Sequence, residues 1–136
     1  MKVSVDRFKT VNFKKLPQTK AWKLTSELIR RRSKGKCYTC GKIFPLNKLN
    51  AGHFIEKTGH AGIYFEDDNL RAQCFRCNRL LHGNLVEYTI RLQKEIGQER
   101  INKLLKKGNK PKIWTKEELE DIENKREEEL EYLKNG

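Results

Sequence analysis

The sequence predicts a small α+β domain with flanking α-helices, and three observations lead to this class. Two Cys-x-x-Cys pairs, CYTC and CFRC, enclose a segment that has strand character. Beyond the second pair, apolar residues recur at helical spacing. Apolar residues make up only 36% of the 136 residues and charged residues 35%, so the core must be small, and a metal ion would help to hold it together.

The first 35 residues are expected to form a basic arm followed by a helix. Residues 1–17 show no firm apolar period and end at Pro17. A helix is predicted from Thr19 onward, with a partial apolar stripe and with Gly35 as its C-terminal stop.

Residues 36–108 are expected to form the core. Residues 43–55 are interpreted as a short hairpin that turns at residues 50–52, and a loop rich in glycine and charge follows. A short helix is predicted from the second cysteine pair to about Leu81.

Three further helices are predicted after this core segment. Apolar residues recur at helical spacing over residues 85–96 and 98–107, and a glycine closes each stretch. Residues 109–136 are expected to be a linker and a charged C-terminal helix, which begins where Thr115-x-x-Glu118 fits a capping box.

The charge of the chain is large and unevenly spread. Its 30 Lys/Arg exceed its 18 Asp/Glu, which gives a formal net charge of +12. Residues 1–36 hold 12 basic and 2 acidic residues, whereas residues 115–136 hold 4 basic and 9 acidic residues. This clustering favours nucleic acid as partner over a merely solubilising surface. The expected DNA contacts are Arg30, Arg31, Arg32, Lys34, Lys36, Arg76 and Arg79.

Neither a membrane span nor a secretory signal is expected. No stretch approaches the roughly 20 apolar residues of a transmembrane helix, and the first ten residues lack an apolar segment. We therefore expect a cytoplasmic protein without a membrane partner, in a compartment that keeps thiols reduced.

In such a compartment the two cysteine pairs are interpreted as metal ligands. Zn²⁺ prefers four tetrahedral thiolates in structural sites, and two Cys-x-x-Cys turns that meet across a fold supply them. A redox dithiol is the alternative, but two pairs without any other cysteine argue against it. The expected ligands of a structural zinc are Cys37, Cys40, Cys74 and Cys77.

The segments around the second pair carry a family resemblance. The string GHFI…DNLRAQCFRCNRLLHGN resembles HNH endonucleases, which have a ββα-metal (His-Me finger) core. A closer similarity, through AGHF, DNLRAQCFRCN and EYTIRL, is to the NinG/Rap family of phage recombination endonucleases, and it covers about half of the chain. The resemblance implies a phage or prophage protein of a bacterial host that cuts branched DNA such as Holliday junctions or D-loops.

Three residues are the expected catalytic group. Phosphodiester hydrolysis needs a base for water and a cation for the phosphate and the leaving oxygen. The resemblance assigns His53 as the general base, Asn69 as the residue whose amide oxygen orients the imidazole, and Asn78 as a ligand of a catalytic Mg²⁺ or Mn²⁺.

Gly52 departs from the family pattern, because many HNH sites have Asp or His immediately before the base as a metal ligand. His82 is ranked first to fill the gap, since it lies four positions after Asn78 and so on the same helical face. The alternative is that His53 is itself a ligand. If His53 is the base, Gly52→Asp is expected to raise metal affinity. The other candidates are Glu56, His60, Asp67 and Asp68.

The leading prediction is therefore a metal-dependent DNA endonuclease. One alternative is a zinc-stapled DNA-binding module without catalysis, which Gly52 favours and the catalytic triplet disfavours. The other is an adaptor that pairs with itself as a homodimer through the charged C-terminal helix.

Overall fold

The computed structural model describes residues 8–135, and these fall into two compact units. The first unit combines the described residues up to Leu28 with those from Lys112 onward, and the second spans Ile29–Pro111. Residues 1–7 of the predicted arm lie outside the described part. Within residues 8–135, no helix has both the length and the apolar character that a bilayer crossing requires.

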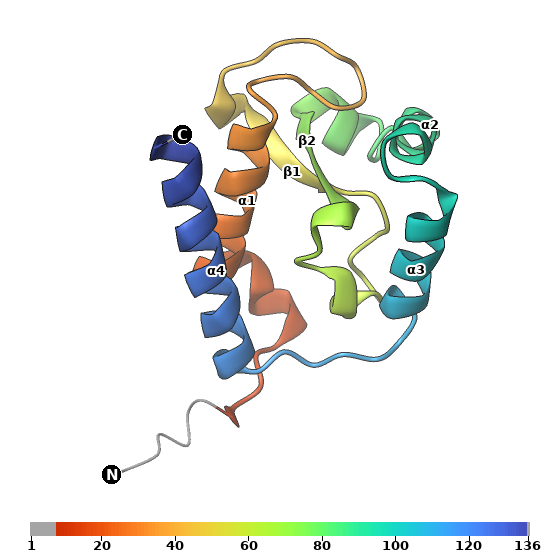
Figure 1. Ribbon diagram of the computed structural model, residues 1–136. Helices are drawn as coiled ribbons and strands as arrows, with labels where there is room; N and C mark the ends of the chain where they lie inside the picture. The colour runs from red at the N-terminus through yellow and green to blue at the C-terminus, as the bar shows by residue number, and fades with distance from the viewer. Residues whose placement is uncertain (1–7, 136) are drawn as a thin grey trace. The chain divides into compact units, whose positions relative to one another are not determined.

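Helix α1 (Lys20–Arg32), whose residues up to Leu28 belong to the first unit, lies beside α4 (Lys116–Asn135) and runs parallel to it (Figure 1). Lys20 pairs with Glu127 at 2.8 Å, and the buried Arg126 guanidinium donates to Thr25 Oγ1 at 3.3 Å. Both helices confirm the predicted helical segments.

The predicted capping box starts α4. The Glu118 N–H donates to Thr115 Oγ1 at 3.2 Å, and the Thr115 N–H donates back to the Glu118 carboxylate at 3.0 Å. The N-terminal segment holds the start of this helix, because Thr10 forms an isolated β-bridge with Thr115. A short 3₁₀ helix, η2 (Phe13–Gln18), follows Thr10 in the chain.

The second unit contains a two-stranded antiparallel sheet. Strand β1 (Leu49–His53) pairs with β2 (Leu70–Cys74), so that Leu49 lies opposite Cys74 and His53 opposite Leu70. The short helical turns η4 (Ala61–Ile63) and η5 (Asp67–Asn69) lie in the connection between the strands. A π-helical segment, η6 (Arg76–Leu80), follows β2, and η3 (Leu46–Lys48) precedes β1. A mixed α+β unit is confirmed.

The hairpin predicted within residues 43–55 was wrong. Residues 50–52, which were expected to turn, lie inside β1 and pair with β2. The small residues at this point serve close packing, because a Cβ at Gly52 would lie 2.0 Å from Gln73 Oε1. Turn propensity and tight packing select the same residue type, and the sequence alone did not distinguish them.

Helices α2 (Leu85–Ile96) and α3 (Gln98–Gly108) confirm the predicted helices after the second cysteine pair. They contribute a cluster of buried side chains in which the Tyr88 ring contacts Phe54 and Tyr38 at centroid distances of 5.2 and 5.4 Å. The helices are thereby joined both to the segment after β1 and to the first cysteine turn.

Candidate functional site

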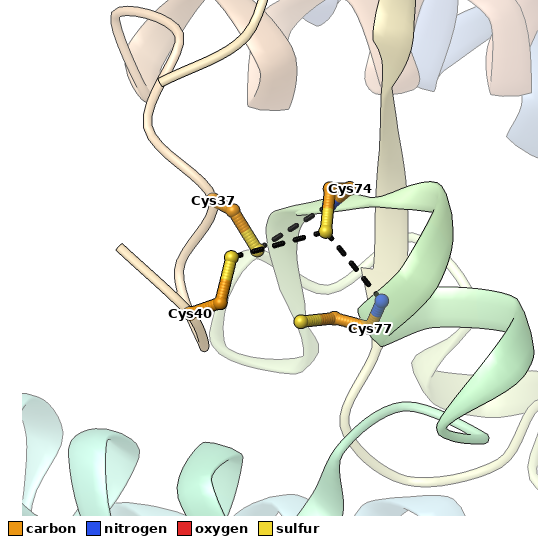
Figure 2. Close-up of side chains that lie close together, drawn as sticks. All are labelled: Cys37, Cys40, Cys74 and Cys77. Atoms are coloured by element: carbon orange, nitrogen blue, oxygen red, sulfur yellow. Dashed lines mark hydrogen bonds between the residues drawn. The ribbon is translucent and has the colours of Figure 1, made fainter. Parts of the chain in front are cut away.

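The four cysteines form one compact cluster (Figure 2). Their Sγ atoms all lie within 4.8 Å of one another, and Cys40 Sγ is 3.9 Å from Cys74 Sγ. Four thiolates around one zinc, with Zn–S bonds of about 2.3 Å, have their sulfurs about 3.8 Å apart. All four cysteines are free of disulfide bonds. Cys37, Cys40, Cys74 and Cys77 are therefore placed to hold a metal ion such as zinc.

Hydrogen-bond donors surround the cluster. The Cys74 N–H points at Cys37 Sγ at 3.3 Å, and the Cys77 N–H points at Cys74 Sγ at 3.5 Å (Figure 2). The Asn84 side-chain amide donates to Cys77 Sγ at 3.7 Å. Donors aimed at sulfur disperse negative charge, as a set of metal-bound thiolates requires.

The pKa values of Cys37 and Cys74 are shifted in opposite directions. Burial opposes ionisation of Cys37, but the N–H groups of Cys74 and Cys40 outweigh it and lower the Cys37 pKa to about 6. Burial raises the pKa of Cys74 to about 12, and the adjacent Cys37 sulfur adds to this rise. Cys37 is therefore the more readily ionised of these two thiols, and a bound divalent cation would favour the thiolate form of the set.

Gln73 links the two cysteine turns from within the sheet. Its fully buried side-chain amide donates to the Gly83 carbonyl at 2.7 Å and to Thr39 Oγ1 at 3.1 Å. Because the Thr39 hydroxyl accepts from Gln73, its own hydrogen can point at Cys37 Sγ, 3.6 Å away. One amide therefore connects β2, the first cysteine turn and the chain that leaves η6.

The same amide explains the glycine before His53. Among residues 8–135 no hydrogen-bond donor reaches the buried Gln73 Oε1. This oxygen lies where a side chain at position 52 would begin, so it faces the Cα hydrogens of Gly52. Many HNH sites have a metal ligand at the position that corresponds to Gly52. In this chain the Gln73 side chain occupies the space that a side chain at position 52 would need. The structure weighs against the expectation that Gly52→Asp restores a ligand, because the added Cβ would lie 2.0 Å from Gln73 Oε1 and the amide would have to move.

His53 is the last residue of β1 and is half-buried. Its Nε2 atom lies 3.0 Å from the Tyr64 carbonyl oxygen, and its ring meets the Tyr64 ring edge-on at 4.9 Å. A carbonyl only accepts, so the proton is on Nε2 and the lone pair is on Nδ1. Burial lowers the pKa of His53 to about 4, and Lys57 adds to this, so the ring is neutral at pH 7.

Asn69 is fully buried and holds the chain just after His53. Its Oδ1 accepts from the Ile55 N–H at 2.7 Å, and its Nδ2 donates to the Ile55 and Ile63 carbonyls at 3.2 and 3.4 Å. The structure thus differs from the expected contact between this amide oxygen and the imidazole. Asn69 instead contacts the backbone of Ile55, two residues after His53.

Asn78 is half-buried in η6, whereas His82 is exposed beyond its end. The Leu81 N–H bonds to the Arg76 carbonyl at 2.8 Å, which is the wider π-helical spacing. His82 then adopts a left-handed conformation with φ of 50°. The expected shared helical face of Asn78 and His82 was therefore wrong, because the helix ends before His82.

The sheet register also separates the predicted catalytic residues. His53 pairs with Leu70, four residues along β2 from Cys74, which is about 13 Å of strand. Asn78 follows from the Cys74 end. The structure thus places His53 and Asn69 at one end of the sheet, and the cysteine cluster and η6 at the other.

Of the other candidates for the missing ligand, Glu56 is exposed, whereas Asp67, Asp68 and His60 have partners of their own. Asp67 pairs with Arg32 at 3.3 Å, and Asp68 pairs with Arg100 at 2.5 Å. The His60 imidazole lies 2.8 Å from a backbone carbonyl of its own loop. Within the described part of the chain, the four cysteines are the one group of three or more His, Cys, Asp or Glu side chains close enough to share an ion.

The predicted DNA contacts differ in exposure. Arg30 and Arg31 are half-buried, and Arg30 donates to the Leu46 carbonyl at 3.4 Å. The exposed cations of the set are Arg32, Lys34, Lys36, Arg76 and Arg79.

Gln73 and Tyr88 are site residues that the sequence analysis missed. The buried Tyr88 hydroxyl donates to the Gly52 carbonyl at 2.8 Å and so fixes the strand from the side of α2. A glutamine inside the otherwise apolar end of a strand was the available signal for Gln73. The sequence held no signal for Tyr88, because an aromatic residue at this position is also expected in the apolar stripe of a helix.

Several known proteins are similar to this chain in sequence. The family model described as "Bacteriophage Lambda NinG protein" matches residues 5–136. The chain belongs to the NinG family. Protein ninG of Escherichia phage 933W is 31% identical over 117 residues, which are 85% of this chain and 57% of that relative. Protein ninG of Escherichia phage lambda is 30% identical over 117 residues, with 85% and 56% covered.

A more distant NinG relative, protein ninG of Salmonella phage P22, is 27% identical over 117 residues. The chain spans little more than half the length of these relatives. No solved structure matches the chain. The comparisons confirm the phage NinG part of the predicted resemblance.

Proposed function

We propose that this NinG-family chain is a metal-dependent DNA endonuclease of the HNH type, acting on branched or recombination-intermediate DNA. The observation that carries the proposal is His53: a neutral histidine at the end of a strand, with its proton on Nε2, inside a cysteine-stapled unit of two strands and a helical turn. The branched substrate rests on the resemblance to the NinG/Rap family.

In this proposal His53 is the general base. The Tyr64 carbonyl holds the Nε2 proton, so Nδ1 takes the proton of the attacking water as the water oxygen bonds to phosphorus. The bond to the leaving sugar oxygen breaks as the new bond forms. A pKa of about 4 keeps the base unprotonated at neutral pH, although it also makes the base weak.

Asn69 and Asn78 have supporting roles. Asn69 is a positioning residue, because its bonds to Ile55 fix the backbone that leaves His53. Asn78 would offer an amide oxygen to a Mg²⁺ or Mn²⁺ ion, with waters and phosphate oxygens as the remaining ligands. Such an ion supplies charge stabilisation for the phosphate and the leaving oxygen.

The exposed cations would hold the DNA backbone. Each phosphate contact adds about 0.9 to the slope of log affinity against log salt. Replacing Arg76 and Arg79 with glutamine should therefore flatten the slope by about two, if each arginine contacts one phosphate. An unchanged slope would remove these two residues from the interface.

The second candidate function is a zinc-stapled DNA-binding module without catalysis. The closed position 52 favours it, because the metal ligand that many HNH sites carry there is replaced by the Gln73 amide. Cleavage separates the two functions, since both predict salt-dependent DNA binding.

The test compares linear duplex, single strand and four-way junction with Mg²⁺, with Mn²⁺ and without either, using zinc-loaded protein. His53→Ala should lower the cleavage rate by about 10²–10⁴ and leave DNA binding intact. Asn78→Ala should lose activity that excess Mn²⁺ partly restores. His60→Ala is the matched control, because His60 also bonds to a backbone carbonyl but lies in the loop. Wild-type cleavage by His53→Ala would exclude the nuclease assignment.

A further inference from the structure

The outer face of η6 exposes apolar side chains beside the cysteine cluster. Phe75 is 58% exposed and Leu80 is 62% exposed, whereas Cys77 between them is buried. Phe75 immediately precedes η6 and Leu80 ends it, so the two residues are about one π-helical turn apart. Phe75 and Leu80 therefore project from one side of the segment, and the cysteine sulfur points to the other.

Cations accompany this apolar pair. Arg76 and Arg79 are both exposed, and residues 75–86 contain no Asp or Glu. Exposed apolar residues continue along the chain into α2, at Leu81, Leu85 and Val86. A surface with apolar and cationic groups and no acid suits a partner that has apolar faces and negative charge. Nucleobases and phosphates combine these two properties.

The cysteine cluster holds the backbone on both sides of Phe75. Phe75 lies directly between the ligand Cys74 and the turn that carries Cys77, whose N–H bonds to Cys74 Sγ at 3.5 Å. The backbone at Phe75 is thus fixed by the cluster while its ring stays exposed. A fixed backbone reduces the conformational entropy that such a contact loses on binding.

We propose that the η6 face, made of Phe75, Arg76, Arg79 and Leu80, is a base-contacting surface on which Phe75 stacks against an unstacked base. The two arginines hold the neighbouring phosphates. In a regular duplex both faces of each base are covered by adjacent bases, so the ring can stack only where a base is unpaired or at a break in stacking. The inference rests on the proposed DNA substrate and assigns Phe75 as the residue that distinguishes interrupted from continuous duplex.

The experiment uses the full zinc-loaded chain without Mg²⁺ or Mn²⁺, so that binding is read without cleavage. Two DNAs of equal length carry 2-aminopurine either in a single-base bulge or fully paired. Affinity is measured by anisotropy, and stacking by quenching of 2-aminopurine fluorescence. Phe75→Ala should weaken binding to bulged DNA about tenfold or more, abolish the added quenching, and leave paired duplex unchanged. Phe75→Trp should keep both.

The matched control is Tyr132→Ala, which removes an aromatic side chain that is 81% exposed on the acidic helix α4 and should change neither DNA. Zinc content is compared for all variants. Equal affinities of wild type and Phe75→Ala for bulged DNA would overturn the proposal, as would an equal loss on both DNAs. Phe75-dependent binding to anionic phospholipid vesicles, with no binding to either DNA, would overturn it in favour of a membrane surface.

The two proposals fail separately. If Phe75→Ala binds like wild type but His53→Ala still abolishes cleavage, the stacking surface is excluded and the nuclease stands. If His53→Ala cleaves normally while Phe75→Ala loses bulge binding, the catalytic assignment is excluded and the base-contacting surface stands.

Discussion

Replacing Gly52 with alanine should destabilise the second unit through Gln73. The added Cβ would lie 2.0 Å from Gln73 Oε1 and 2.8 Å from its Cδ, closer than atoms can approach. The amide is not free to swing aside, because its Nε2 donates to the Gly83 carbonyl and to Thr39 Oγ1. Relief of the collision therefore breaks both hydrogen bonds in a buried environment.

The expected cost follows from these two bonds. A net loss of about 0.5–1.5 kcal/mol is typical of one intramolecular hydrogen bond, and an acceptor left buried without a donor costs about 1–3 kcal/mol. Alanine in a strand is otherwise preferred to glycine by about 0.5–1 kcal/mol. Gly52→Ala should therefore lower the free energy of unfolding by about 2–4 kcal/mol.

A double-mutant cycle isolates the contact. Urea unfolding is followed by circular dichroism at one fixed concentration of free zinc, because bound metal contributes to stability. In a Gln73→Ala background the collision is gone, so Gly52→Ala should cost nearly nothing and the coupling energy should be about 2–4 kcal/mol. Gly59→Ala is the control: no atom lies within 4 Å of its Cβ, and its φ of +79° alone should cost about 1–2 kcal/mol.

One pattern of results would refute this reasoning. If Gly52→Ala has wild-type stability and shows no coupling with Gln73→Ala, the amide does not occupy the space above Gly52. The Gln73 side chain would then not be the reason why position 52 lacks the Asp or His that many HNH sites have there.

The remaining predictions concern the metal and pH. Purified protein should hold one zinc per chain in its single cysteine cluster, and Cys74→Ser should lose the metal and unfold the second unit; a metal-free variant with wild-type circular dichroism would contradict this. The folded pKa of His53, about 4, lies below its ordinary value of 6.5, so stability should fall as pH drops from 6.5 towards 4, where the unfolded chain binds more protons. Between pH 7.5 and 5.5, at saturating zinc, wild type should lose about 1 kcal/mol more than His53→Gln in urea unfolding. Equal losses would show that burial does not lower this pKa.

The helices could be predicted well because their signals are local. The helical spacing of apolar residues before Gly97 and the capping box at Thr115 each act within a few residues of the chain. The cysteine cluster was also predictable, since the chemistry of zinc demands four close thiolates and the chain has four cysteines.

The strand pairing could not be predicted in the same way. Asn50, Ala51 and Gly52 have turn character by themselves, yet they lie in a strand whose partner is about twenty residues further along. The choice depends on a long-range register, which local propensity does not encode. His82 shows the same limit, because the left-handed backbone at its position ends the helix that the four-residue spacing had assumed.

The sequence by itself determined the NinG resemblance, the helices and the four cysteines that could hold a metal, because each depends on residue types at fixed spacing. Only the tertiary structure decided what surrounds His53. The Tyr64 carbonyl sets its proton, Asn69 holds the backbone after it, and the Gln73 amide closes the position before it. These contacts join residues that are distant in sequence, and burial, which gives them their energetic weight, exists only in the folded chain.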